Sequence, residues 1–312
     1  MKDIYIFDNE PLDYLIKTGL HCVHKDYVDY LIKKEDIKEI ATPKKLNYKI
    51  GIIIPNYNYE EWIDKCLTSI ANQTYKNFEV IFCDDCSTDN SVNIAYKYVE
   101  KMNIKIVQLQ QKRLNGGTRN EAYLWLSDDV DYVYYIDSDD WLKDNKVLEK
   151  INNSLQGSPD VLFVGVGVGR NGIEYGEYIP RYADRYEAIK GWSGSCGKVI
   201  RKEFATAQEN LYQEGTLKED RTQHYKICIH MKSFKNLSEI VYIWNRNNIK
   251  SVSTKRDTIE WKVSTYRNYA DALELYGKEK GKDLRMDKIL ADRVANCKNE
   301  LDTGGDGQQW HI

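Results

Sequence analysis

Apolar and polar positions alternate in two different ways between residues 49 and 166. Five short runs rich in Ile, Val, Phe and Tyr favour buried strands. They span residues 50–54, 78–82, 104–109, 132–136 and 160–166. Between them, apolar residues recur at helical spacing in segments 60–73, 91–101 and 147–155, and another helix is expected to open at residues 115–120. The alternation predicts right-handed crossovers and an open, mostly parallel α/β sheet flanked by helices.

The pattern loosens after residue 166. Closely spaced glycines between residues 165 and 176 favour a hairpin or loop, and residues 191–197 read as a flexible loop that carries Trp192. We expect one further strand and three helices, at residues 240–244, 217–227, 259–276 and 283–301. The chain therefore divides into an N-terminal extension, a central α/β domain and a C-terminal helical region with a tail. These span residues 1–46, 47–255 and 256–312.

Polar clusters follow three of the predicted strands directly. They occupy residues 55–58, 84–89 and 137–140. The carboxyl ends of parallel strands lie along one edge of a sheet, and ligands of open α/β sheets bind beyond that edge. We therefore expect the three clusters to converge on one cleft.

The third cluster places three carboxylates within four residues, at Asp137, Asp139 and Asp140. Crowded carboxylates raise one another's pKa unless a cation lies among them. A hard divalent ion, Mg²⁺ or Mn²⁺, that is shared with a phosphate would resolve the repulsion. A solvated turn that caps the next helix explains the same residues, and the cluster alone does not separate the two interpretations.

Composition narrows the class of protein only slightly. The chain has 312 residues, 42% hydrophobic and 30% charged, which is typical of globular proteins. A net charge of −3 argues against strong attraction to nucleic acid or anionic membranes, although a nucleic-acid acceptor stays open. No transmembrane-length run or signal peptide is evident, and seven irregularly spaced cysteines indicate reduced thiols. We expect a cytoplasmic protein, either free or peripheral at the inner face of the membrane.

Four segments together resemble the family-2 glycosyltransferases, inverting enzymes with the GT-A fold. Residues 53–58 are similar to their P-x-Y-N turn, and residues 80–89 to their D-D-x-S-x-D segment. Residues 134–142 resemble the D-x-D metal motif, and residues 218–220 the E-D motif that carries the catalytic base. The resemblance runs from residue 49 to residue 253 and implies a Rossmann-like GT-A sheet.

The resemblance implies a nucleotide-sugar donor, with a UDP-sugar the best fit, and Mn²⁺ or Mg²⁺. Tyr57 would stack on the base, Asp85 would accept a hydrogen bond from it, and Arg119 would face the pyrophosphate. The donor-binding set implied in this way is Pro55, Tyr57, Asp84, Asp85, Arg119, Asp137 and Trp192. Asp139, with Asp137 and Asp140, would hold the metal ion.

The resemblance assigns the acceptor side of the reaction to Asp220 and Glu219. The resemblance makes Asp220 the general base that takes a proton from an acceptor hydroxyl, and Glu219 would tune it. The Trp192 loop would border the sugar and a glycan or other hydroxyl-bearing acceptor. Acids are also favoured at a helix start by the helix dipole, so both residues have a purely structural explanation.

The sequence departs from the family pattern in two places. The N-x-G-x-x-x-A-R-N segment is compressed at residues 115–120, and Asn248 lies near the position of a histidine that often helps to bind the metal. The Q-x-x-R-W motif of membrane-bound processive synthases is absent, which favours addition of one or few sugars. A phosphotransferase fits poorly, because its D-x-D belongs after the first strand and here the motif follows the fourth. A catalytically inactive sugar- or nucleotide-binding module stays open as the alternative function.

Overall fold

The computed structural model describes residues 47–171, 173–206, 211–216, 219–249, 259–278 and 284–302. The predicted N-terminal extension, the domain boundaries at residues 46 and 255 and the C-terminal tail lie outside these ranges. The remaining predictions can be compared with the described elements.

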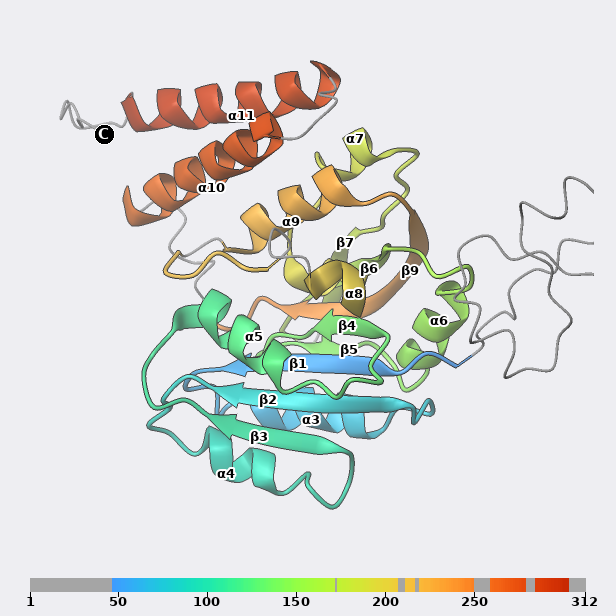
Figure 1. The fold of residues 1–312 in the computed structure, drawn as a ribbon. Coiled ribbons are helices and arrows are strands. Elements are labelled where there is room, and N and C mark those ends of the chain that lie inside the picture. Colours follow the sequence, from blue (N-terminus) through green and yellow to red (C-terminus); the bar gives the residue numbers. More distant parts are fainter. Residues whose placement is uncertain are drawn as a thin grey trace, which may run out of the picture. The chain divides into compact units, whose positions relative to one another are not determined.

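The first half of the described chain forms the parallel part of one sheet, in the order β3-β2-β1-β4 (Figure 1). These strands are β1 (Ile50–Asn56), β2 (Phe78–Asp84), β3 (Ile104–Gln108) and β4 (Tyr132–Tyr135). The intervening helices are α3 (Ile63–Ala71), α4 (Ser91–Tyr96) and α5 (Leu114–Leu124). Each predicted crossover of this half is confirmed, although β1 continues through Pro55, where the sequence predicted that the strand would stop.

The second half extends the same sheet with mixed directions. The described strands complete a nine-stranded sheet in which β4 is followed by β8, β6, β9 and β5, and β7 pairs with β6. Six of the nine strands run in one direction, because β6 and β9 are parallel to each other and antiparallel only to their other neighbours. The added strands are β5 (Trp141–Leu142), β6 (Val161–Arg170), β7 (Ile173–Tyr178), β8 (Lys198–Arg201) and β9 (Phe234–Asn245). The predicted mostly parallel α/β fold is confirmed.

Strand β6 is longer than the glycine-rich sequence predicted. Three glycines that favoured a hairpin or loop lie inside the strand, and the hairpin to β7 follows only at Arg170. A Cβ atom on Gly165 would stand 2.3 Å from the backbone oxygen of Glu239 in β9. Glycine is therefore required here by the close approach of two backbones at a register shift, not by a turn.

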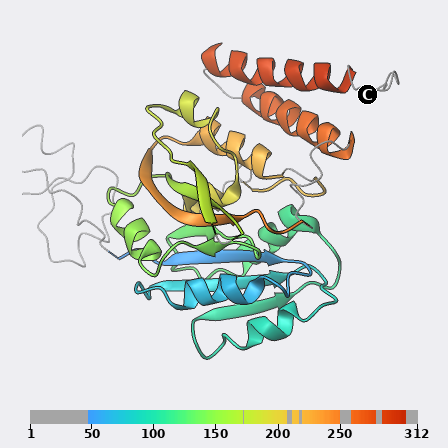
Figure 2. The same ribbon diagram turned by 180° about the vertical axis from the view of Figure 1, so that it is seen from behind.

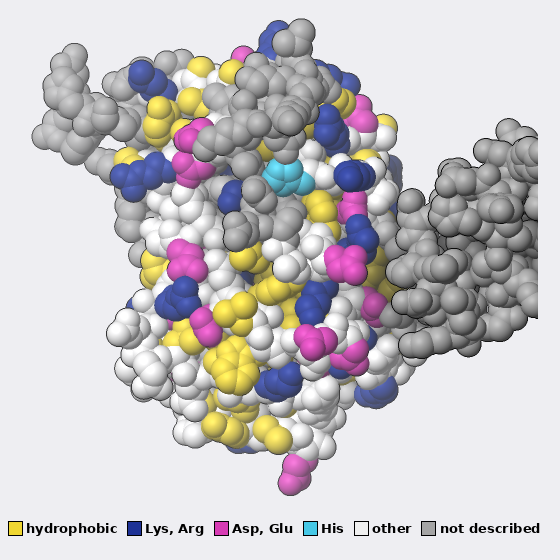
Figure 3. All heavy atoms as spheres, viewed as in Figure 1, with side chains coloured by type: hydrophobic (Ala, Val, Ile, Leu, Met, Phe, Trp, Pro, Cys, Tyr) yellow, Lys and Arg dark blue, Asp and Glu magenta, His cyan; other side chains and the backbone are white. Residues whose placement is uncertain are grey.

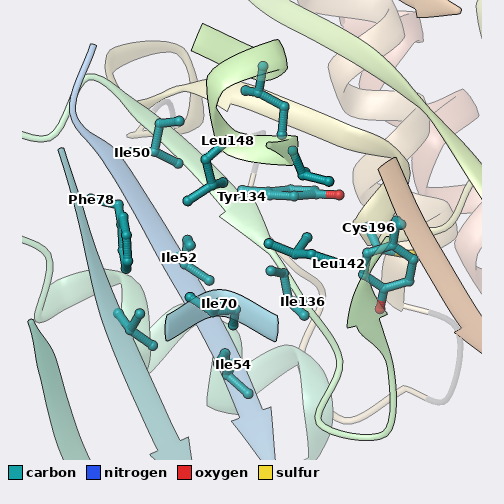
Figure 4. Close-up of a cluster of buried hydrophobic side chains, with 14 of the residues drawn as sticks. Ile50, Ile52, Ile54, Ile70, Phe78, Tyr134, Ile136, Leu142, Leu148 and Cys196 are labelled. Atoms are coloured by element: carbon teal, nitrogen blue, oxygen red, sulfur yellow. The ribbon is translucent and has the colours of Figure 1, made fainter. Parts of the chain in front are cut away.

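Two apolar cores cover the two faces of the sheet. One, shown in Figure 4, packs the Ile side chains of β1 and Tyr134 of β4 against α3 and α6 (Val147–Ser154). The other packs the opposite side of β1 and β4 against α5, α9 (Glu219–His230) and α10 (Ile259–Lys278). Figures 1 and 2 show α5 and α3 on opposite sides of the sheet. Because both faces of β1 and β2 are buried, their sequences are mostly apolar and do not alternate with exposed polar residues.

The predicted C-terminal helices are confirmed as α10 and α11 (Leu284–Asp302). Tyr269 of α10 stacks on Tyr225 of α9, with ring centroids 5.1 Å apart, which attaches the helical region to the second core. Two short helices, α7 (Arg185–Ala188) and α8 (Lys202–Thr206), complete this side. Within the described ranges no helix has the length and apolar content needed to cross a membrane. Charges of both signs are interspersed on the face shown in Figure 3.

Candidate active site

The turns after β1, β2 and β4 meet through hydrogen bonds at one edge of the sheet. The backbone N–H of Asp85 donates to the carbonyl of Asn56, and the Asn56 amide donates to Asp84, each over 2.8 Å. The Ser138 hydroxyl donates to the carbonyl of Pro55 over 2.7 Å. The three polar clusters therefore form one connected surface, as the strand ends predicted.

Tyr57 lies at the rim of this surface. Its side chain is exposed, and the Lys112 ammonium lies 3.2 Å from the ring centroid. Asp84, in contrast, is buried and accepts hydrogen bonds from the Asn56 amide and from the backbone and hydroxyl of Ser87. The geometry leaves Tyr57 available to stack on a ligand and uses Asp84 to hold the turns together.

Asp85 is also buried and binds the segment that leads into α5. Its two carboxylate oxygens accept hydrogen bonds from the backbone N–H groups of Arg113 (2.6 Å) and Leu114 (2.9 Å). Leu114 has a φ of 58°, a left-handed conformation that these bonds help to fix. A carboxylate oxygen can accept a second hydrogen bond, so a base N–H is still a possible further partner.

The three carboxylates after β4 have different environments. Asp137 is the most exposed of them. Both oxygens of Asp140 are occupied, one by the Tyr242 hydroxyl and the other by the Asn245 backbone N–H at 2.7 Å. Burial and the neighbouring carboxylates raise the pKa of Asp140 well above its usual range. Asp140 thus fixes β9 beneath the site, and it is the most deeply buried of the three carboxylates.

Asp139 lies beneath the surface and is bonded by Asn248. The Asn248 amide donates to its carboxylate over 2.7 Å, and the Tyr59 hydroxyl lies beside Asn248. Burial and the charge of Asp137 raise the pKa of Asp139 to about 6. Asn248 and Tyr59, with nearby acidic and polar residues, also line a cavity of 210 Å³. An added cation would relieve the cost of ionising Asp139.

The donor set available for that cation is small. Among the described residues, no group of three His, Cys, Asp or Glu side chains is arranged to bind a metal ion. Mg²⁺-type ions are commonly held by one or two carboxylates, and phosphate and water oxygens complete the coordination. Asp139 and Asp137 therefore fit an ion that arrives with a diphosphate better than an ion held by the protein alone.

Arg119 of α5 joins two motifs that are far apart in the sequence. Its guanidinium donates to Asp137 over 2.6 Å and to Glu219 at the start of α9, and the side chain is buried. Although burial opposes the charge, Asp137 and Glu219 raise the pKa of Arg119 well above its usual range. Arg119 therefore bridges two carboxylates, and its contact with a pyrophosphate stays a prediction.

Glu219 and Asp220 differ in accessibility. Glu219 is buried on Arg119, and burial outweighs the guanidinium and raises the pKa of Glu219 to about 7. Asp220 is only half-buried and has no hydrogen bond to Arg119. An accessible carboxylate next to a clamped one suits the division into base and supporting residue that the sequence predicted.

Trp192 is packed on several sides. It stacks on Tyr178 of β7 at 5.2 Å and 13°, and a Cβ atom on Gly194 or Gly197 would collide with the indole. Trp244 of β9 lies 6.3 Å away at a tilt of 45°. The 191–197 loop is thus a packed element, and the exposed ring of this stack is Tyr178, not Trp192.

Sequence reasoning missed three residues that shape the site: Tyr242, Asn248 and Lys198. Tyr242 and Asn248 belong to or follow β9 and contact carboxylates more than a hundred positions earlier. Lys198 opens β8 and is fully buried, although a lysine in a polar loop reads as exposed. Only Asn248 left a signal, because the histidine expected nearby was absent.

The fold is an open α/β sheet in which the carboxylates that follow β2 and β4 gather at one edge. The profile of the family described as glycosyl transferase family 2 matches residues 51–213, which is more than half of the chain. The chain belongs to this family.

Characterised relatives match shorter stretches. The chain is 32% identical over 128 residues to the poly(ribitol-phosphate) β-N-acetylglucosaminyltransferase TarS of Staphylococcus aureus, covering 40% of this chain and 22% of TarS. It is 30% identical over 157 residues to the UDP-Glc:α-D-GlcNAc-diphosphoundecaprenol β-1,3-glucosyltransferase WfgD of Escherichia coli, covering 49% of this chain and 60% of WfgD. The matches span less than two thirds of either relative.

Solved structures support the fold. S. aureus TarS residues 1–349 in complex with UDP-GlcNAc superposes with a TM-score of 0.70 over 82% of this chain and 74% of the other, at 23% identity. A mannosyltransferase from Pyrobaculum calidifontis in complex with GDP-Man and Mn²⁺ gives a TM-score of 0.55 at 14% identity, over 83% and 76% of the two chains. The predicted GT-A fold is therefore confirmed.

Proposed function

We propose that this chain is a metal-dependent, inverting glycosyltransferase that moves a sugar from a UDP-linked donor to the hydroxyl of a glycan acceptor. The observation that carries the proposal is the Arg119 bridge, because it brings the carboxylate after β4 and the acidic pair of α9 to one point. A donor diphosphate and a proton acceptor have to lie this close for a direct displacement.

The donor half of the proposed site is the surface around Tyr57 and Asp139. Tyr57 stacks on the base, and Asp85 accepts one hydrogen bond from it in addition to those from Arg113 and Leu114. Asp139 and Asp137 hold the divalent ion, which when bound supplies Lewis-acid stabilisation of the departing diphosphate. The two relatives named above, which use UDP-linked sugars by their names or complexes, support the choice of UDP.

The acceptor half is the start of α9. Asp220 takes the proton from the attacking hydroxyl, while Glu219 and Arg119 hold the helix start against the donor half. A side chain that acts as base has to reach the acceptor, and Asp220 is the more accessible of the two acids. Inversion follows if the hydroxyl attacks from the side opposite the diphosphate.

Two linked measurements test this function. Calorimetry should show UDP binding that depends on Mn²⁺ or Mg²⁺ and is lost with a chelator. Mass spectrometry of products from a panel of UDP-, GDP- and TDP-sugars with oligosaccharide acceptors should show transfer of one sugar with inverted anomeric configuration. Equal UDP affinity with and without metal would contradict the metal role, and binding without any transfer would favour a sugar-nucleotide-binding module.

A further inference from the structure

Lys198 is a fully buried cation on the acceptor side of the site. It opens β8, which lies between β4 and β6 in the sheet. Its ammonium donates to the backbone carbonyls of Ser193 and Gly194, each over 2.7 Å. Burying an ammonium costs several kcal/mol unless its donors are satisfied. These two bonds are thus the reason that the side chain can remain charged inside the protein.

Both carbonyls belong to the loop that supports the aromatic stack. Gly194 is one of the two glycines against which the Trp192 indole packs, and the same indole stacks on Tyr178. Any shift of the Ser193–Gly194 backbone would therefore move Trp192. The ammonium of Lys198 fixes the loop at the point where the aromatic stack rests on it.

The ammonium also faces one stripe of α9. Asp220, His224 and Cys228 are four residues apart and share one side of the helix. Burial lowers the pKa of Lys198 to about 8, and the charge of Arg119 acts in the same direction. Asp220, Cys228 and Cys196 act in the opposite direction and raise the pKa. In turn, burial and then Lys198 depress the pKa of His224 well below its usual range. Lys198 therefore interacts with the stripe that carries Asp220 through charge, without a hydrogen bond to it among the described contacts.

We propose that Lys198 is a positioning residue that ties the 191–197 loop to the Asp220 end of α9, so that loop and base keep one relative position. The inference rests on the proposed function, because it assigns the base to Asp220. The ammonium would hold the loop, and with it the aromatic stack, by its two hydrogen bonds to Ser193 and Gly194, and its charge would attract the carboxylate of Asp220.

The first test needs no acceptor. The Lys198 ammonium can be titrated by NMR in the wild type and in Asp220→Asn. The lysine should titrate near pH 8 in the wild type. It should titrate lower in the variant, because the largest charge that favours the ammonium is gone. An unchanged titration would overturn the electrostatic part of the inference whether or not the protein is an active transferase.

The second test separates positioning from folding. Lys198→Met should lower the turnover of UDP-sugar by about 10- to 100-fold, the scale of a misplaced catalytic group, while UDP affinity stays within about twofold, since donor residues are untouched. Lys198→Arg keeps the charge and should restore part of the turnover. The wild type should lose activity as pH rises through 8, and Lys198→Arg should remove that loss, because arginine stays protonated. Lys190→Met, an exposed lysine next to the loop, is the matched control.

Three outcomes would overturn the inference. They are wild-type turnover in Lys198→Met, an alkaline loss of activity near pH 8 that persists in Lys198→Arg, and a fall in Lys190→Met as large as that in Lys198→Met. Asp220→Asn is assayed in parallel. If Asp220→Asn transfers sugar at the wild-type rate, the proposed base is wrong. If Lys198→Met transfers sugar at the wild-type rate and Asp220→Asn does not, only the positioning role is wrong.

Discussion

The donor and acceptor halves of the site are built in different ways. The donor half uses side chains from three adjacent turns, and most of its hydrogen bonds join residues or backbone groups of neighbouring strands. The acceptor half joins α5, β8 and α9 through buried charges, with Arg119, Glu219 and Lys198 all within the protein interior. We infer that the donor half tolerates single changes better than the acceptor half, where each lost charge leaves another unpaired.

Arg119→Met gives the largest effect that this comparison predicts. It leaves Glu219 buried without a cation, and breaking a buried pair in this way costs about 3–5 kcal/mol. The free energy of unfolding from urea titrations should fall by that amount, and transfer should be lost. Arg113→Met, which removes partly exposed ion pairs of the same helix, is the control and should cost about 1 kcal/mol or less. Equal losses in the two variants would remove the distinction between the halves.

Asp139→Asn tests the donor half. The change keeps the side-chain volume and removes the carboxylate, so metal-dependent UDP affinity should fall by about 10- to 100-fold, or ~1.4–2.8 kcal/mol. Calorimetry with Mn²⁺ gives the affinity, and the unfolding free energy should not fall, since ionising Asp139 opposes folding at neutral pH. Unaltered UDP affinity in the presence of Mn²⁺ would mean that Asp139 does not bind the metal ion.

The stability of the acceptor half should depend on pH through Glu219. Its folded pKa of about 7 lies above the ordinary value of a glutamate, so the native state binds the proton more tightly than the unfolded state. The Glu219 contribution to stability is then complete below pH 4.5 and is lost as pH rises to about 7, which linkage bounds at ~3 kcal/mol. Glu219→Gln should flatten that part of the curve of unfolding free energy against pH. An equally steep decline in the variant would assign it to another group.

Tyr57→Ala is expected to have the smallest effect. Loss of a stacking ring at the rim costs about 0.5–1.5 kcal/mol, so UDP affinity should fall by about 2- to 12-fold with little change in stability. Tyr96→Ala, another exposed tyrosine on α4 away from the turns, serves as the control. A preference for GDP over UDP in the wild type would contradict the base pocket as a whole.

The same contrast explains what the sequence could predict. The donor half follows from local order, because each polar cluster directly succeeds an apolar run and parallel strands bring such ends together. Tyr57, Asp84, Asp85 and Asp137 were placed correctly at that edge. The fold class and the C-terminal helices could also be predicted, from the spacing of apolar residues. The length of β6 could not, because Gly165 is required by the close approach of the β9 backbone, which the sequence does not show.

The contacts of the acceptor half could not be predicted from the local order of the sequence. The partners of Arg119 lie 18 and 100 positions away, and Asn248 reaches Asp139 across 109 positions. No local pattern encodes such pairs. The same holds for the hydrogen bonds that Tyr242 and Asn245 make to Asp140 and for the packing of Trp192 against Tyr178 and two glycines, because these contacts also join distant positions.

The central claim is that Asp220 is the catalytic base of a sugar transfer. Asp220→Asn keeps the size of the side chain and removes the proton acceptor, so single-turnover transfer from a bound UDP-sugar should fall by about 10²–10⁴-fold. UDP affinity should stay at the wild-type value, since Asp220 has no hydrogen bond to the proposed metal ligands or to Arg119 among the described contacts. Transfer by Asp220→Asn at a near wild-type rate, with donor binding intact, would contradict the claim and would move the base to Glu219.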